Sequence, residues 1–228
     1  MTARTSTLSA AVLVFAIAAG PALAQDNTAP LLPEGVIDAH RMIVEPPALG
    51  TPRFHEEMST VLWLQETRTP EQIEFVESTL NLERFAPVVG EAIFEVDGPA
   101  LKALIDTAID EVRSDYDAVK GVYDYPRPFE ISAAVDPVGD ARPVASYPSG
   151  HAIRAIVYAR LLSEVFPEKA DELVDLANRI GHGRVVAGVH YPMDVSQGQI
   201  LGNAYADAII AEPAFQASIA DIRSPEVL

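Results

Sequence analysis

Apolar side chains recur at intervals of three and four residues in three stretches of the chain, and this spacing constrains the fold more than any other feature. The stretches run from Leu101 to Val112, from Ile153 to Leu162 and from Leu173 to Ile180. Such spacing places the apolar side chains on one face of an α-helix. Alternating patterns typical of strands are scarce, and no internal repeat is evident. The sequence therefore predicts an all-α fold built as one helical domain.

Helix boundaries are marked by proline and by capping residues. Thr69 is suited to cap a helix whose first turn holds Pro70, with Gln72 reaching back to the cap. Pro167 ends the helix of the second apolar stretch. A last helix is expected over residues 192–211, because Pro192 again suits a first helical turn.

The N-terminal segment has the anatomy of a secretory signal peptide. Arg4 precedes an unbroken apolar run from Ala10 to Ala19, and Ala22-Leu23-Ala24 supplies a small-x-small cleavage site. The apolar run is too short to span a bilayer comfortably. We expect cleavage after Ala24, which would leave a periplasmic or secreted protein with no membrane segment.

The predicted organisation therefore has three parts. Residues 1–24 form the signal peptide, residues 25–53 an extended lead-in, and residues 54–228 the helical domain. Five prolines between positions 30 and 52 argue against regular helix in the lead-in.

Charge and cysteine content exclude several classes of protein. The 228 residues carry 33 Asp and Glu against 16 Lys and Arg, a net charge of -17. Nucleic acids and anionic lipid surfaces attract an excess of cations, so neither is an expected partner. The chain has no cysteine, which excludes disulfides, thiolate nucleophiles and cysteine zinc sites.

Three short patterns of basic and histidine residues stand in order along the second half of the chain. They are K-x6-R-P from Lys120, P-S-G-H from Pro148 and R-x5-H-x3-D from Arg184. Arginine grips two oxygens of an anion through a planar fork, and a helix that opens at S-G offers unpaired N–H groups. Taken singly, each of these residues is typical of an ordinary surface or helix cap.

The joint pattern resembles the three-part signature of the PAP2 superfamily of phosphatases, and most closely the bacterial class A non-specific acid phosphatases. This resemblance implies an all-α fold of the PAP2 and vanadium-haloperoxidase-like type. It also implies a secreted acid phosphatase acting on small phosphomonoesters, in a family where homo-oligomers are frequent. One position departs from the signature, since Gly183 stands before Arg184 where the family has serine. We expect this change to remove a hydroxyl group beside the site.

The resemblance also implies which residues hold the phosphate group. Lys120, Arg127 and Arg184 supply positive charge to the phosphate oxygens. Ser149 and the amide of Gly150 hold further oxygens at the start of a helix.

The catalytic roles implied by the family fall on two histidines and one aspartate. His190 is the nucleophile and forms a phosphohistidine. Asp194 accepts the proton of the other ring nitrogen and so orients the ring. His151 protonates the leaving alkoxide and then activates water. Opposite protonation states of the two histidines predict an acidic pH optimum.

We expect neither a metal nor a cofactor. No H-E-x-x-H or clustered carboxylate motif appears, and three cations at the site would oppose a divalent ion.

Three alternatives remain open from the sequence. The first is a vanadium-dependent haloperoxidase with vanadate on His190, although such proteins are usually far larger. The second is a lipid phosphate phosphatase, whose usual members have several membrane helices. The third is a protein that binds phosphate without turnover, for which Gly183 is the one hint.

Overall fold

The computed structural model of the protein describes residues 30–91, 98–139 and 141–223. Within these ranges the chain forms helices and loops and no strand. The predicted all-α fold is confirmed. The predicted signal peptide, residues 1–24, lies outside the described residues.

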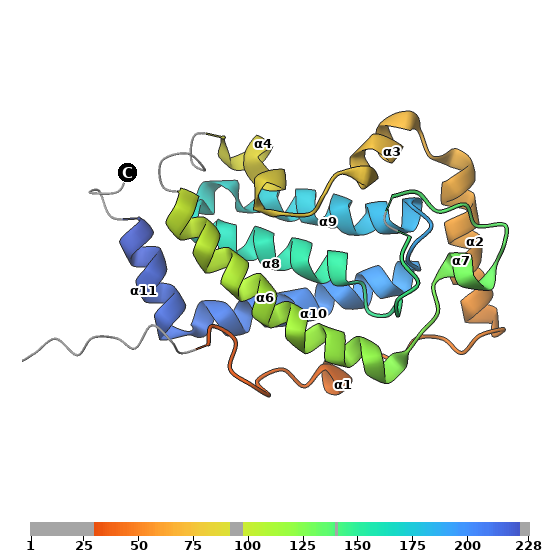
Figure 1. The fold of residues 1–228 in the computed structure, drawn as a ribbon, viewed down its shortest axis with the longest axis horizontal. Helices are drawn as coiled ribbons and strands as arrows, with labels where there is room; N and C mark the ends of the chain where they lie inside the picture. Colours follow the sequence, from red (N-terminus) through yellow and green to blue (C-terminus); the bar gives the residue numbers. More distant parts are fainter. Residues whose placement is uncertain (1–29, 92–97, 140, 224–228) are drawn as a thin grey trace, which may run out of the picture.

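Three long helices form the central layer of the fold. Helix α8 (Gly150–Val165) lies between α9 (Ala170–Val186) and α10 (Pro192–Ala211) and packs against both (Figure 1). Helix α6 (Gly98–Tyr123) crosses α8 and packs on it. The functional motifs of the sequence lie at the ends of these four helices or in the loops beside them.

Helix α8 is the centre of the hydrophobic core. Ten of its 16 residues are buried, so it is covered on most sides rather than along one stripe. Helix α10 approaches it closely through two glycines. A Cβ atom at Gly198 would lie 2.8 Å from the carbonyl oxygen of Ser149, and one at Gly202 would lie 2.7 Å from that of Ile153. Glycine at both positions therefore lets the two backbones meet.

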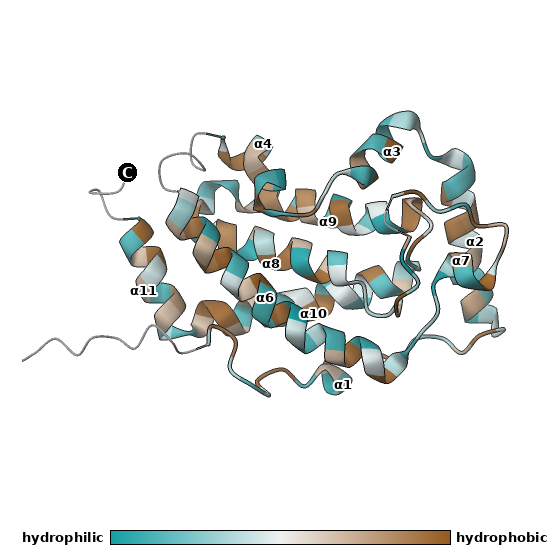
Figure 2. Ribbon diagram, viewed as in Figure 1, coloured by the Kyte–Doolittle hydropathy of each residue, from teal (hydrophilic) through white to brown (hydrophobic). Residues whose placement is uncertain are grey.

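Helix α6 buries one face and exposes the other. Its ribbon carries hydrophobic and hydrophilic residues in turn, as expected for an amphipathic helix (Figure 2). The buried face includes Leu101, Ile105, Ala108, Ile109 and Val112, which are the residues of the predicted apolar stripe apart from the partly buried Leu104.

The other helices of the described residues surround this centre. They are α1 (Ala39–Met42), α2 (Pro52–Thr67), α3 (Pro70–Glu77), η1 (Leu82–Phe85), α4 (Ala86–Val89), α7 (Pro128–Ile131), η2 (Pro167–Lys169) and α11 (Pro213–Ile222). Helix α3 lies along α9, and α11 lies beyond the end of α10 (Figure 1).

The predicted start of α3 is confirmed at atomic detail. The hydroxyl of Thr69 accepts a hydrogen bond from the N–H of Gln72, and the Gln72 side chain accepts one from the N–H of Thr69. These two bonds form the reciprocal capping box expected from the sequence.

Two expectations about helix positions need correction. The helix at 192–211 is present but is not the last, because Pro213 begins α11. The lead-in of residues 25–53 contains α1, and α2 begins at Pro52, inside that segment. In both α2 and α11 proline occupies the first turn, where its missing N–H breaks no helical hydrogen bond.

None of the helices in residues 30–91, 98–139 and 141–223 combines the length and apolar character needed to cross a bilayer.

Candidate active site

Six of the eight predicted site residues line one cavity of about 400 Å³. The six are Lys120, Arg127, Gly150, His151, Arg184 and His190. They come from the end of α6, the loop before α7, the start of α8, the end of α9 and the loop before α10. The fold therefore brings residues separated by up to 70 positions around one hollow.

The remaining two predicted residues lie behind the cavity wall. Ser149 is fully buried, and its hydroxyl accepts a hydrogen bond from the N–H of Ala152, so it caps α8. Asp194 is also buried, in the first turn of α10. The Ser149 N–H donates to the Asp194 carbonyl at 2.9 Å. This bond joins the starts of α8 and α10.

Gly150, the first residue of α8, exposes its backbone to the cavity because glycine has no side chain. A Cβ atom at Gly150 would lie 2.9 Å from a ring carbon of Tyr116. Gly150 is the first residue of α8, where N–H groups have no partner within the helix. Its position gives an anion direct access to the positive end of the helix.

His190 and Asp194 form a buried hydrogen-bonded pair. His190 Nδ1 lies 3.0 Å from Asp194 Oδ2, and both side chains are 1% exposed. The same carboxylate oxygen accepts from the hydroxyl of Ser146 at 2.5 Å and from the N–H of Tyr191 at 3.0 Å. Because the carboxylate accepts at Nδ1, the neutral imidazole carries its hydrogen there.

The other nitrogen of His190 faces Arg127. Arg127 Nη1 lies 3.3 Å from His190 Nε2. A guanidinium can only donate, so Nε2 is the acceptor and keeps its lone pair. Arg127 is itself held by two main-chain carbonyls, those of Val144 and Val189, each at 2.9 Å.

Lys120 is positioned by the loop that precedes α8. Its Nζ donates to the carbonyls of Ala145 at 2.7 Å and Ser146 at 3.1 Å. Burial, followed by the charge of Arg127, lowers the pKa of Lys120 to about 8.

Arg184 reaches the cavity from the last turn of α9. Its side chain is buried, with 5% exposed. A buried guanidinium retains its charge because its pKa is far above neutral.

Burial and positive neighbours lower the pKa of both histidines well below the ordinary value. For His190 the main cause is burial, followed by Arg127 and Lys120. For His151 burial again comes first, followed by Arg184 and Arg154. A bound anion would oppose the effect of these cations, since an opposite charge nearby favours the protonated imidazole.

The pKa of Asp194 is raised, whereas the pKa values of the two histidines are lowered. Burial raises its pKa to about 6, while the hydrogen bonds from Ser146 and the Tyr191 N–H act against this rise. The carboxylate thus depends on its donors and on Lys120 to remain charged in a dry environment.

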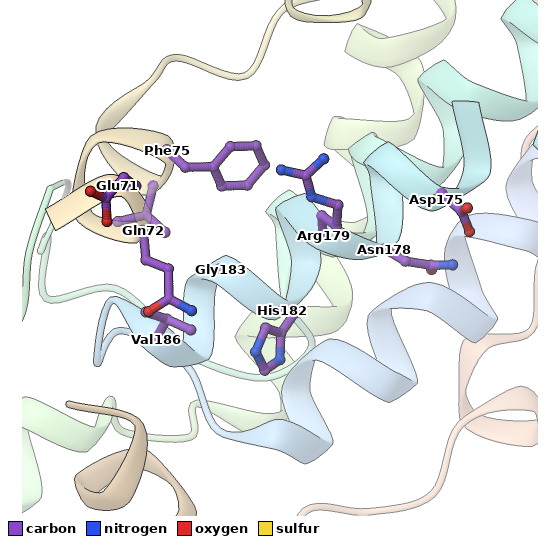
Figure 3. Close-up of a pocket in the computed structure, with 10 residues that line it drawn as sticks. Glu71, Gln72, Phe75, Asp175, Asn178, Arg179, His182, Gly183 and Val186 are labelled. Atoms are coloured by element: carbon purple, nitrogen blue, oxygen red, sulfur yellow. The ribbon is translucent and has the colours of Figure 1, made fainter. Parts of the chain in front are cut away.

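Gly183 does not lie beside the cavity, which corrects the expectation from the sequence. A Cβ atom there would lie 2.9 Å from Val76 Cγ1 and 3.7 Å from a ring carbon of Phe75, both on α3. Successive residues of a helix point about 100° apart, so position 183 faces α3 while Arg184 faces the cavity. Figure 3 shows Gly183 and His182 at a separate pocket of about 590 Å³ between α3 and α9.

Several residues that shape the site were not predicted from the sequence. Ser146 bonds Asp194, and Arg113, Tyr116, Arg142 and Arg154 line the cavity. For two of them, helical spacing in the sequence could have predicted their position. Arg113 precedes Lys120 by seven residues on α6, which is close to two full turns, and Arg154 follows His151 by three residues on α8. Ser146 and Arg142 stand in a loop, where no periodicity predicts side-chain direction.

Among the described parts of the chain, no group of three or more His, Cys, Asp or Glu side chains could hold a metal ion.

These features define a helical protein whose cationic cavity holds an oriented, unprotonated histidine nitrogen. The profile of the PAP2 superfamily matches residues 102–212, a range that contains every predicted site residue. Residues 102–212 form a PAP2 superfamily domain, as the three motifs predicted.

Similar proteins from three bacteria are named acid phosphatases. The chain is 32% identical over 154 residues to a non-specific acid phosphatase of Salmonella typhimurium, an alignment that covers 64% of this chain and 61% of the relative. It is 26% identical over 191 residues to a non-specific acid phosphatase of Providencia stuartii, covering 79% of this chain and 77% of the relative. An acid phosphatase of Zymomonas mobilis is 27% identical over 140 residues, covering 59% of this chain and 53% of the relative. The chain thus spans less than two thirds of the length of the Salmonella relative.

Proposed function

We propose that this protein is an exported, metal-independent acid phosphatase that hydrolyses phosphomonoesters through a phosphohistidine on His190. The observation that carries the proposal is the state of the His190 ring. Its Nδ1 is held by Asp194, while Nε2 keeps a lone pair and lies 3.3 Å from an arginine in a cationic cavity. The names of the similar proteins point to the same activity.

In the first step His190 Nε2 attacks phosphorus and forms an N–P bond. The bond between phosphorus and the ester oxygen breaks, and His151 gives its proton to the departing alkoxide. The products are an alcohol, neutral His151 and phosphorylated His190. Asp194 stabilises the positive charge that develops on the His190 ring.

In the second step water attacks the phosphorus atom of the phosphohistidine. Neutral His151 takes a proton from this water as the new P–O bond forms. The N–P bond breaks, its electron pair returns to Nε2, and inorganic phosphate is released. Both histidines are then in their starting states.

The surrounding cations stabilise the transferred group. Lys120, Arg127 and Arg184 offset the charge on its oxygens, and the N–H groups at the start of α8, including that of Gly150, donate hydrogen bonds to these oxygens. Ser149 contributes indirectly in this scheme, because its hydroxyl caps α8 and so fixes the helix start.

The pH dependence follows from His151. It must be protonated in the first step, yet burial and the nearby arginines lower its pKa. The charge of a bound phosphate ester raises that pKa again. Turnover therefore falls as the pH rises through the pKa of His151 in the substrate complex, which gives an acidic optimum.

Export is proposed from the N-terminal segment, whose charge, apolar run and cleavage site match a secretory signal. Comparing the mass of the N-terminus before and after export tests cleavage following Ala24.

The assay that tests the function compares His190→Ala with His182→Ala. His182 is a matched control, since it lines the separate pocket of Figure 3. We expect the wild type and His182→Ala to hydrolyse p-nitrophenyl phosphate at pH 5 to 6, and His190→Ala to be inactive. Turnover by His190→Ala at the wild-type rate would refute the nucleophile.

Two further measurements separate the alternatives. Halide oxidation with added vanadate would support a haloperoxidase. Phosphate binding with no hydrolysis would support a binding protein, although Gly183, the hint for that alternative, faces α3.

A further inference from the structure

We propose that the preferred substrates are phosphomonoesters whose alcohol part carries a second phosphate group. The proposal rests on the phosphatase function above and deepens it. Arg113, Arg142 and Arg154 form the second phosphate subsite, on the side of the cavity where the alcohol leaves.

The cavity continues into a second hollow that could hold a longer substrate. The site cavity of about 400 Å³ adjoins a hollow of about 240 Å³. Both are lined by Arg113, Arg142, His151, Arg154 and Arg184. The second hollow is also lined by residues 76–80, which are the last two residues of α3 and the three that follow it.

The positive charge of the two hollows exceeds what one phosphate group requires. In the described chain they are lined by six Lys and Arg side chains and by two carboxylates, Asp117 and Glu77. Six of the chain's 16 cations thus gather here, in a protein of net charge -17. Three of the six are assigned to the transferred phosphate, and Arg113, Arg142 and Arg154 remain.

Arg154 is held at the start of α8, where its Nε donates to the carbonyl of Gly150 at 3.2 Å. Arg113 of α6 lines the same two hollows as Arg154. Residues on α6 and α8 therefore converge on the same part of the cavity.

The position of His151 indicates which part of a substrate these arginines meet. His151 donates its proton to the leaving alcohol in the proposed mechanism, so the alcohol lies beside it. The charges of Arg154 and Arg142 both lower the pKa of His151. Arg113, Arg142 and Arg154 line the second hollow together with His151. A second phosphate attached to the alcohol would consequently lie among them.

Calorimetric binding of two non-hydrolysable ligands tests the subsite without relying on turnover. The ligands are propane-1,3-bisphosphonate and propylphosphonate, which differ only in the second anionic group. The variant is Arg113→Gln/Arg154→Gln. The control is Arg160→Gln, also on α8, whose side chain pairs with Asp207 and Asn203 away from the cavity.

We expect the wild type and Arg160→Gln to bind the bisphosphonate at least about tenfold more tightly than the monophosphonate. Hydrogen bonds to charged groups contribute about 1.5–3 kcal/mol each. The double variant should therefore lose most of this preference and bind the two ligands about equally, and thermal unfolding checks that it is folded. The preference should also weaken at high salt.

Equal binding of the two ligands by the wild type would overturn the proposal, and so would an unchanged preference in the double variant. Hydrolysis of propane-1,3-diol bisphosphate and propyl phosphate is measured in parallel. If the binding preference holds but neither ester is hydrolysed, the proposed function fails while the subsite stands.

Discussion

At the scale of single residues, the candidate site holds one buried carboxylate that several hydrogen-bond donors surround. Asp194 accepts hydrogen bonds at one oxygen from His190, from Ser146 and from the N–H of Tyr191. Removing water strengthens each of these interactions and also makes the loss of any one of them costly. In the proposed mechanism Ser146 acts through this carboxylate and is a positioning residue.

Ser146→Ala should shift the acid limb of the pH–rate profile to higher pH. The Ser146 hydroxyl lowers the pKa of Asp194, so its removal raises that pKa above about 6. In the proposed mechanism the ionised carboxylate is the active form, and it is lost as the pH falls through this pKa. A profile of kcat from pH 4 to pH 8 measures the shift.

Ser163→Ala is a suitable control for this profile, because Ser163 bonds only to the carbonyl of Ala159 along α8 among the hydrogen bonds of the described chain. An acid limb that is the same in Ser146→Ala and in the wild type would contradict the role of Ser146.

At the scale of helices, the site depends on how closely α6, α8 and α10 approach one another. Gly150 sits against Tyr116 of α6, and Gly198 sits against the first turn of α8. These contacts fix the start of α8, where the phosphate is proposed to bind.

Gly150→Ala should destabilise the protein, whereas Gly121→Ala should stabilise it. A Cβ atom at Gly150 meets the Tyr116 ring at 2.9 Å, while one at Gly121 on α6 meets nothing within 4 Å. Overpacking costs about 1–3 kcal/mol, and alanine replaces glycine in an exposed helix with a gain of up to about 1 kcal/mol. Urea unfolding measures both changes in the free energy of unfolding.

Equal effects of the two substitutions would contradict the tight packing at Gly150. Adding Tyr116→Leu to Gly150→Ala should recover part of the loss, because the shorter side chain vacates the contact.

Helix positions and capping were predictable because they depend on local spacing. The capping box at Thr69, the helix from Pro192 to Ala211 and the buried stripe of α6 all follow from the sequence and recur in the structure. The helix after Pro213 was missed, since a proline marks the end of one helix and the start of another equally well.

The site residues in the three motifs were predictable only because the motifs occur together. Their meeting around one cavity depends on tertiary packing, which no local pattern encodes. The same reason explains the error at Gly183 and the omission of Ser146. The direction of a side chain beside a motif is set by the neighbouring helix or loop.

At the scale of the whole molecule, an acidic protein concentrates its few cations where an anion is to bind. The net charge of -17 disfavours the approach of phosphate esters, and the cationic cavity offsets this locally. In the proposed function, positive side chains at the site supply the charge that many phosphatases obtain from metal ions.

Exhaustive treatment with EDTA should leave turnover within about twofold of the untreated enzyme. Lys120, Arg127 and Arg184 already provide the positive charge that a metal would bring, and they repel a divalent ion. A rate assay before and after chelation measures the effect. A large loss that is restored by a divalent ion would refute metal independence.

The most direct test of the central claim is to trap and map the covalent intermediate. The wild type is mixed with a phosphomonoester, quenched within milliseconds under conditions that preserve phosphohistidine, digested and analysed by mass spectrometry. The account predicts one transient phosphoryl group, on the ring of His190, whose amount rises and decays with turnover. Hydrolysis at full rate with no phosphoryl group on His190, or with the group on another residue, would contradict it.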